Sequence, residues 1–268
     1  MSAGASAYSF VGEQAASSWT SSSENPYSRK PFAKEPSFFM HATIDAPHIA
    51  IQVRNVTLSL GNTQILKGID LDIRRGESLA ILGASGSGKS SLMAILSGLE
   101  QASGGTVSVA GVNYRSLDED GLARARRGRI GIILQSFHLL PTMTALENVA
   151  VPLELAGLAD PFARAAQELK AVGLGHRLSH YPAQLSGGEQ QRVAIARAMA
   201  PDPAILLADE PTGNLDQATG TAIIDLLFAR QQASGATLLI ITHDPALAAR
   251  CDRTVEMRDG QLSGEVAA

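Results

Sequence analysis

The sequence contains very little cysteine, and this scarcity limits where the chain is expected to work. Cys251 is the single cysteine among 268 residues, so no disulfide can form within the chain. Folds that depend on disulfides belong to oxidising compartments. We therefore expect Cys251 to be a structural thiol in a reducing, cytosolic setting, not a nucleophile.

Long hydrophobic runs and an excess of positive charge are also missing. No uninterrupted apolar run approaches the ~18 residues that a membrane-spanning helix needs, so the chain is not expected to cross a bilayer by itself. The 22 Lys and Arg residues oppose 26 Asp and Glu residues, which leaves a formal charge of −4. Because no overall cationic field surrounds such a chain, we expect no nucleic-acid partner.

Aromatic residues make up only 4% of the chain, and seven of the twelve lie within residues 1–39. This segment also contains ten serines and has neither helical nor strand periodicity, so it is predicted to be a disordered tail. It lacks the basic start, apolar core and small-residue cleavage site of a signal peptide. Met40 would make a natural start of the chain, and the aromatic residues could instead form a docking motif. Removal of residues 1–39 is expected to leave activity unaffected.

Hydrophobic residues, in contrast, make up 45% of the chain, which is enough for a sizeable buried core. From about residue 48 onward, short β-rich runs alternate with helical stretches; the runs are residues 48–60, 69–73, 77–83, 106–111, 130–135, 204–209 and 237–242. Several of them are apolar at successive positions, as are central strands covered on both faces. The sequence thus predicts an α/β fold with a mainly parallel sheet flanked by helices.

The stretch over residues 136–185 has a different character. Its pattern is mostly helical, and it is interrupted by Pro141, Pro152, Pro161 and Pro182. Asp160 followed by Pro161 is typical of a helix start, because an acidic N-cap and a proline at the first helical position both suit that end. We predict that residues 136–185 form an inserted helical subdomain.

The most informative motif is GASGSGKS, which lies between an apolar strand and a helical run. Its glycines allow the backbone to turn successive N–H groups inward, which forms a nest for a phosphate at a helix N-terminus. Lys89 would neutralise the β- and γ-phosphate oxygens, and Ser90 would offer a hydroxyl to Mg²⁺. The nucleotide-binding residues predicted here are Gly83, Ala84, Ser85, Gly86, Ser87, Gly88, Lys89, Ser90 and Ser91.

Acidic and amide side chains follow two other predicted strands. Asp209 ends the run AILLAD with Glu210 directly after it, and Gln135 ends the run IGIILQ. Taken alone, the two acids favour a strand that simply reaches solvent, and Gln135 an ordinary surface residue. Beside a phosphate loop, Asp209 is instead predicted to hold the Mg²⁺ shell and Glu210 to polarise the attacking water. The predicted metal-site residues are Ser90, Gln135 and Asp209.

A second anion-binding helix start is predicted at LSGGEQQR, residues 185–192. Ser186 and Glu189 fit a capping box, while Gly187 and Gly188 leave the start of the helix unobstructed. The positive end of a helix attracts an anion. In a single chain, however, capping alone would explain the motif.

In their order along the chain, these motifs resemble those of the ATP-binding cassette (ABC) ATPases, over roughly residues 48–266. The resemblance implies a phosphate-loop NTPase fold: a mainly parallel sheet core, an antiparallel β subdomain and the inserted helical subdomain. It also implies Mg²⁺-dependent hydrolysis of ATP to ADP and phosphate. The matching elements are Walker A (Gly83–Ser90), Gln135, the signature (Leu185–Arg192), Walker B (Ile205–Asp209), Glu210, Asn214–Asp216 and His243.

The same resemblance implies a role for each matched side chain. Glu210 would be the general base, His243 would contact the γ-phosphate, Gln135 would sense Mg²⁺ and the γ-phosphate, and Asp216 would help to link two sites. The bland alternative is that Asp216 and Asp244 cap helices. A homodimer would enclose two ATP molecules head to tail, and the residues that would face the nucleotide of the other subunit are Ser186, Gly187 and Gly188.

Three longer stretches, QSFHLLPTMTALENVAVPL, LADEPTGNLD and THDPALAARCDR, are similar to the lipoprotein-release and macrolide-export branch of the family, nearest to its YbbA-like members. This similarity implies a cytoplasmic energy subunit, held on the inner face of the membrane by a separate permease. Amino-acid importers share much of the pattern. A regulator of the envelope or of cell division, which acts through a membrane partner without transport, is the alternative of a different class. Cargo and direction depend on the permease.

Some residues depart from the family pattern or invite other interpretations. Where the family places an aromatic ring under the adenine, this chain offers Leu60, so weak base selectivity is expected.

His138, His176 and His180 lack metal-ligand spacing. A cluster of arginines is predicted to form a solvated helix face balanced by neighbouring acids, because no stacking aromatics are interleaved; it consists of Arg124, Arg126, Arg127 and Arg129.

Large apolar side chains follow Gln135 in a predicted connecting segment, at Phe137, Leu139 and Leu140. Connecting segments normally carry polar residues. The resemblance places this segment against the permease, which predicts a coupling surface. Packing within the core of the helical subdomain is the alternative, especially for Leu139.

Overall fold

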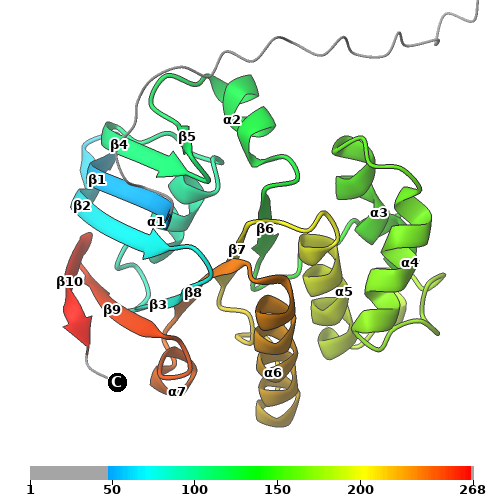
Figure 1. The fold of residues 1–268 in the computed structure, drawn as a ribbon. Coiled ribbons are helices and arrows are strands. Elements are labelled where there is room, and N and C mark those ends of the chain that lie inside the picture. The colour runs from blue at the N-terminus through cyan, green and yellow to red at the C-terminus, as the bar shows by residue number, and fades with distance from the viewer. Residues whose placement is uncertain (1–47, 267–268) are drawn as a thin grey trace, which may run out of the picture. The chain divides into compact units, whose positions relative to one another are not determined.

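The computed structural model describes residues 48–266, so the tail predicted over residues 1–39 lies outside the described residues. Within the described part of the chain, the strands form two sheets (Figure 1). A four-stranded antiparallel sheet has the order β2-β1-β4-β5, and a six-stranded sheet has the order β10-β9-β3-β8-β7-β6. The strands are β1 (Ile49–Leu60), β2 (Thr63–Arg74), β3 (Ser78–Leu82), β4 (Gly104–Val109), β5 (Val112–Asn113), β6 (Ile130–Ile133), β7 (Ile205–Asp209), β8 (Thr237–Thr242), β9 (Arg253–Arg258) and β10 (Gln261–Val266).

Helices separate most of these strands along the chain. They are α1 (Lys89–Leu96), α2 (Glu119–Arg126), α3 (Ala145–Leu155), α4 (Pro161–Ala171), α5 (Gly187–Met199), α6 (Gln217–Ser234) and α7 (Pro245–Ala248). A 3₁₀ turn, η1 (Pro182–Gln184), precedes α5. No helix in the described range is long and apolar enough to pass through a bilayer.

The six-stranded sheet is mainly parallel, which confirms the predicted fold class. β3 pairs in parallel with β8 and β9, and β7 pairs in parallel with β6 and β8, while β10 is antiparallel at one edge. Successive side chains of β3 enter different hydrophobic clusters: Leu79 and Ile81 belong to one, and Ala80 belongs to the other. The central strands are buried on both faces, as their continuous apolar sequences require.

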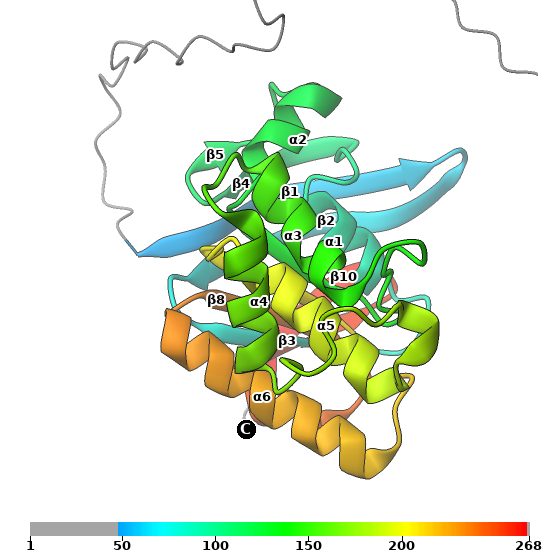
Figure 2. The ribbon, with the colours of Figure 1, turned by 90° about the vertical axis from the view of Figure 1, so that its right-hand side faces the viewer.

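Different parts of the chain cover the two faces of this sheet. One cluster joins it to the antiparallel sheet and α1, through residues such as Val53 and Leu92. The other cluster joins it to α3, α5 and α6, through residues such as Val149, Ile195 and Leu227. α3 and α4 lie within the predicted helical insertion, and they pack beside the sheet together with α5, which begins after it (Figures 1 and 2).

Several helix starts follow the capping chemistry of the sequence, and one predicted cap is absent. α3 begins with a capping box between Thr144 and Glu147, and the Asp244 carboxylate accepts from the Ala246 N–H at 2.8 Å at the start of α7. α4 does begin at Pro161, but Asp160 makes no capping hydrogen bond. The prediction for the Asp160 side chain was wrong, because its backbone takes a left-handed conformation with φ of 50° and not the extended conformation of an N-cap.

The predicted arginine face on α2 is only partly solvated. Arg124 is exposed on α2, and Arg127 and Arg129 are exposed but follow the end of the helix at Arg126, so they are not part of the predicted helix face. Asp118 caps the helix by accepting from the Gly121 N–H at 2.7 Å. Arg126 differs from the prediction, because its guanidinium donates to the Gly98 carbonyl oxygen at 2.8 Å. Arg126 thus anchors α2 to the turn that follows α1.

Candidate active site

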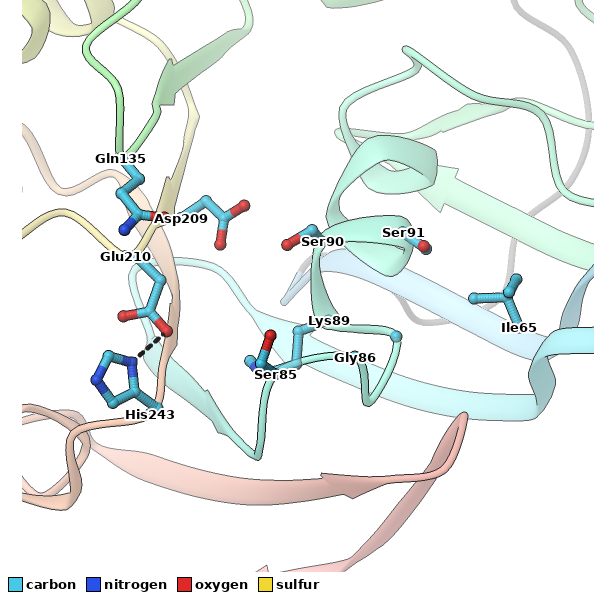
Figure 3. A pocket seen from close by; sticks show the side chains of 11 residues that line it. Ile65, Ser85, Gly86, Lys89, Ser90, Ser91, Gln135, Asp209, Glu210 and His243 are labelled. Atoms are coloured by element: carbon cyan, nitrogen blue, oxygen red, sulfur yellow. Dashed lines mark hydrogen bonds and ion pairs between the residues drawn. The ribbon is translucent and has the colours of Figure 1, made fainter. Parts of the chain in front are cut away.

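A cleft of about 670 Å³ opens where several parallel strands of the six-stranded sheet end (Figure 3). Parallel strands present their carboxyl ends at one edge of a sheet, so groups that follow different strands meet there. The phosphate loop lies on one side of the cleft, and polar residues from the ends of β6, β7 and β8 lie on the other. The lining residues are Ile65, Ser85, Gly86, Gly88, Lys89, Ser90, Ser91, Gln135, Asp209, Glu210 and His243.

The loop between β3 and α1 holds the side chain of Lys89 inside its own curve. The Lys89 ammonium donates to the carbonyl oxygens of Gly83 at 2.7 Å and Ala84 at 2.8 Å, and the residue is only 7% exposed. An ammonium group has three N–H donors, so one donor remains beyond these two bonds. The positive charge is therefore fixed at the point where the loop faces the cleft.

The loop glycines provide both a special backbone conformation and space. Gly86 and Gly88 have φ of 80° and 104°, in the left-handed region that glycine adopts without strain. A Cβ atom on Gly83 would lie 2.4 Å from the Met257 carbonyl oxygen, which no side chain permits, whereas one on Gly86 would meet nothing within 4 Å. The hydroxyl of Ser87 is buried and has no hydrogen-bond partner among the described residues. This loop can accept an anion that supplies the missing contacts.

Glu210 and His243 meet across the ends of β7 and β8. His243 Nδ1 lies 2.8 Å from Glu210 Oε1, and Figure 3 shows this pair on the wall opposite the phosphate loop. The Glu210 N–H donates to the Ile241 carbonyl oxygen at 2.9 Å, while its φ of 45° directs the chain away from the strand. The sheet thus brings together two predicted catalytic side chains that are 33 residues apart.

Asp209 carries its carboxylate at the half-buried carboxyl end of β7. Burial raises the pKa of Asp209 above its ordinary value; the charge of Glu210 acts in the same direction, and Ser90 and Lys89 oppose it. A partly desolvated carboxylate near the Ser90 hydroxyl and the Gln135 amide suits a hydrated Mg²⁺, which prefers oxygen ligands and needs few of them from protein. The donor set that the structure offers therefore fits the predicted cation.

Gln135 is held by the segment that follows Glu210. Asn214 Nδ2 donates to the Gln135 carbonyl oxygen at 2.9 Å. A Cβ atom on Gly213 would lie 2.6 Å from Gln135 Nε2, so a larger residue there would displace the Gln135 side chain. The position of the Gln135 side chain is thus coupled to the chain between Glu210 and α6.

The signature residues lie outside the cleft of their own chain. Ser186 and Glu189 form the predicted capping box at the start of α5, but Ser186, Gly187 and Gly188 are not among the lining residues. Asp216 caps α6 by accepting from the Thr219 N–H at 3.0 Å, and hydrogen bonds from the Thr219 side chain and from its N–H lower the pKa of the exposed Asp216 carboxyl. One chain therefore brings the phosphate loop and the catalytic candidates together, but not the signature.

The segment after Gln135 has a strained backbone that sequence reasoning missed. Phe137 and His138 have φ of 60° and 48°, and their carbonyl oxygens accept from Arg197 on α5 at 2.7 and 2.6 Å. Burial lowers the pKa of the Arg197 guanidinium. No local signal marks Arg197, because its partners are some 60 residues earlier in the chain.

The three apolar residues of this segment have different surroundings. Leu139 packs against the hydrophobic cluster of the helical region, so for this residue the core-packing alternative is correct. Phe137 is half-buried, and Leu140 is 42% exposed. Accessible apolar surface remains at Leu140 and, in part, at Phe137.

Other sequence candidates are placed less centrally. Leu60, proposed to lie under the base, is 56% exposed and does not line the cleft; Ile65 at the start of β2 does. Cys251 is buried, and burial, with a smaller effect of the Asp252 charge, raises the pKa of its thiol to about 12. A buried thiol with so high a pKa is not a nucleophile at neutral pH. His138 and His176 are exposed.

Comparisons with known proteins agree with this geometry. A model of the ABC transporter family matches residues 66–213. The protein from Escherichia coli strain K12 named uncharacterized ABC transporter ATP-binding protein YbbA is 49% identical over 221 residues, which cover 80% of this chain and 97% of that protein. The lipoprotein-releasing system ATP-binding protein LolD of Alcanivorax borkumensis is 48% identical over 201 residues, 74% of this chain and 88% of that protein.

A solved structure with a bound nucleotide is also similar. It is the dimeric post-hydrolysis state of the ATP-binding cassette MJ0796 bound to ADP and Pi, with a TM-score of 0.74 and 39% sequence identity. The match covers 81% of this chain and 97% of that one.

Proposed function

This chain is an ATP-hydrolysing subunit that belongs to the ABC transporter family, and we propose that it works as a Mg²⁺-dependent homodimer that drives a separate membrane permease for lipoprotein release or export. Its place would be the cytoplasmic face of the membrane, where the permease holds it. The single observation that carries the proposal is the cleft in which the phosphate loop faces Gln135, Asp209, Glu210 and His243.

Different residues of the cleft bind the phosphates, the Mg²⁺ ion and the base of the nucleotide. The loop N–H groups and the remaining donor of Lys89 bind the β- and γ-phosphates, because positive charge and preorganised N–H groups stabilise the triphosphate. Ser90, Gln135 and Asp209 would hold Mg²⁺, which supplies charge neutralisation when it is bound. Ile65 offers an apolar surface to the base without a stacking ring.

The opposite wall supplies the groups for hydrolysis. Glu210 accepts a proton from the attacking water, and His243 donates a hydrogen bond to the γ-phosphate. The Glu210–His243 contact of 2.8 Å supports this assignment, because it places both side chains at one end of the cleft. Positioning and charge contribute most to phosphoryl transfer, so small displacements of these groups should matter.

The signature residues complete the site in a dimer. In one chain Ser186, Gly187 and Gly188 lie outside the cleft, and the N-terminus of α5 is closed by the capping box of Ser186 and Glu189. A two-fold dimer would place this terminus against the γ-phosphate of the other chain, and the same contact would form twice. The dimeric state of the similar MJ0796 cassette supports this arrangement.

The proposed cargo class comes from the similarity to LolD, whose name describes a lipoprotein-releasing system. The test is reconstitution of the chain in vesicles with a candidate permease, identified by co-purification with the chain. We expect ATP- and Mg²⁺-dependent release of a lipid-anchored protein, which Lys89→Ala abolishes. If the permease binds the chain and controls its ATPase rate but no cargo leaves, the non-transport regulator is correct.

A further inference from the structure

Glu189 creates an electrostatic problem at the start of α5. The residue lies in the first turn of the helix whose N-terminus, under the proposed function, faces the γ-phosphate of the partner chain. Hydrogen bonds from Ser186 lower the pKa of the Glu189 carboxyl, so it is ionised at neutral pH. A negative charge there stabilises the helix by itself. The same charge repels an incoming triphosphate.

The structure compensates this charge with one cation. Glu189 Oε2 accepts from the Ser186 N–H at 2.9 Å and from its hydroxyl at 3.0 Å, which completes the capping box. The other oxygen, Oε1, accepts from Arg177 Nε at 3.0 Å. The Glu189 side chain is 14% exposed and that of Arg177 is 36% exposed, so water screens the pair only in part.

Arg177 is itself held in place by the loop between α4 and η1. Its Nη1 lies 3.0 Å from His180 Nε2, and since a guanidinium can only donate, the imidazole nitrogen accepts. The Arg177 N–H donates to the Leu174 carbonyl oxygen at 2.9 Å, and the His180 carbonyl oxygen accepts from the Ala145 N–H at 2.8 Å. These bonds fix the loop against α3 and direct the guanidinium toward α5.

We propose that Arg177 is a positioning residue for ATP hydrolysis, which neutralises Glu189 so that the signature of one chain can approach the γ-phosphate bound by the other. This inference rests on the proposed function. Arg177 itself does not touch the nucleotide. It acts through Glu189, and its importance depends on the negative charge of that side chain.

The test is a double substitution in the full-length chain. In the wild-type background, Arg177→Gln should raise the KM for ATP roughly two- to fivefold, the size expected for one charge near a helix N-terminus, with little change in kcat. In a Glu189→Gln background, which keeps a capping-box residue but removes the charge, Arg177→Gln should have no further effect. Arg177→Lys, which keeps the positive charge, should recover at least half of the loss.

A second measurement separates this inference from the proposed function. Light scattering of Glu210→Gln gives the ATP concentration at half-maximal dimer, and Arg177→Gln should raise it by the same factor. If Glu210→Gln stays monomeric at saturating ATP, the proposed dimer fails and the inference fails with it. If it dimerises but Arg177→Gln has no effect, or an equal effect with and without Glu189→Gln, only the role of Arg177 is refuted.

The chain offers a matched control. Arg164 pairs with Glu168 at 3.0 Å and its side chain is 44% exposed, while Glu168 keeps a second partner in Arg230. Arg164→Gln therefore removes the same charge from the same helical region without exposing an unpaired acid beside the signature. It should leave the KM for ATP unchanged. A shift as large as that of Arg177→Gln would show that net charge, and not the Glu189 contact, is responsible.

Discussion

His243 Nδ1 lies 2.8 Å from Glu210 Oε1. The contact joins the ends of two parallel strands, since β7 and β8 pair with Asp209 opposite Ile241. His243 is 69% exposed at its side chain and Glu210 is 16% exposed. The carboxylate is therefore oriented by a partner on its accessible side, and its second oxygen remains for water.

Glu210→Gln should separate binding from hydrolysis. The amide keeps the size of the carboxylate but cannot accept the proton of the attacking water, and a general base contributes about 100-fold or more to rate. We expect ATP affinity within about threefold of wild type and turnover reduced at least ~100-fold, as measured by equilibrium binding and phosphate release. Glu154→Gln, an exposed position on α3, is the control. Turnover of Glu210→Gln at the wild-type rate would remove Glu210 from its assigned role.

Asp209→Asn should stabilise the chain while it impairs the reaction. Because burial raises the Asp209 pKa above 3.8, the unfolded state ionises more readily than the folded state, and folding stability falls as pH rises from about 3.8 toward the raised pKa. Asparagine removes this dependence. We expect a higher melting temperature without nucleotide at pH 7, a smaller difference near pH 4, and Mg²⁺-dependent turnover at least about tenfold lower. An unchanged or lower melting temperature at pH 7 would contradict the cost of burying this charge.

The parts of the site that could be predicted from the sequence are those formed by residues that are adjacent in the chain. All seven predicted strand runs from residues 48–60 to 237–242 correspond to strands of the structure, and the phosphate loop, with its flanking strand and helix, lies where the motif places it. In these segments the continuous apolar residues and the positions of the glycines determine the local structure. A short stretch of sequence is therefore enough to predict it. The location of Asp209 and Glu210 in the site could be predicted because both residues lie at the carboxyl end of one predicted strand.

The missed features depend on contacts distant in sequence or on an overlooked turn. β9 and β10 were not predicted, although Asp259-Gly260 between two alternating runs is a hairpin signal; both residues have positive φ, 46° and 76°. Arg197 and Arg177 gave no sign of their roles, because their partners are fixed only when α5 packs against other segments. The Ile65 position in the cleft likewise depends on how β2 passes the phosphate loop.

Gly188→Ala should damage the signature helix through a single clash. A Cβ atom on Gly188 would lie 2.5 Å from Thr219 Cγ2 on α6, and overpacking of this kind costs typically 1–3 kcal/mol. We expect a lower free energy of unfolding and weaker ATP-driven dimerisation. Adding Thr219→Ser removes the methyl group but keeps the hydroxyl and the N–H that Asp216 accepts from, so it should restore stability. Urea unfolding of the wild type, the two single variants and the double variant measures this, and no recovery in the double variant would show that the contact with Thr219 is not the cause of the loss.

The segment after Gln135 should connect the cleft to the permease. Substitution of its exposed residues should therefore separate permease association from basal ATP hydrolysis. Arg197 anchors the carbonyl oxygens of Phe137 and His138 to α5, Leu139 is used in the core, and Leu140 is 42% exposed beside this anchor. A movement of Gln135 during hydrolysis would therefore shift the surface formed by Phe137 and Leu140 and, through it, a bound permease helix.

Phe137→Ala and Leu140→Ser should weaken permease association about tenfold or more, with basal ATPase activity within about twofold of wild type. Leu155→Ser is the matched control, because Leu155 is 62% exposed at the end of α3, away from this segment in sequence. Association is measured by co-purification with the reconstituted permease, and basal hydrolysis and thermal unfolding on the isolated chain. If Phe137→Ala unfolds the isolated chain, Phe137 is a core residue and Leu140→Ser alone carries the test. If Leu140→Ser and Leu155→Ser then bind the permease equally well, the coupling surface lies elsewhere.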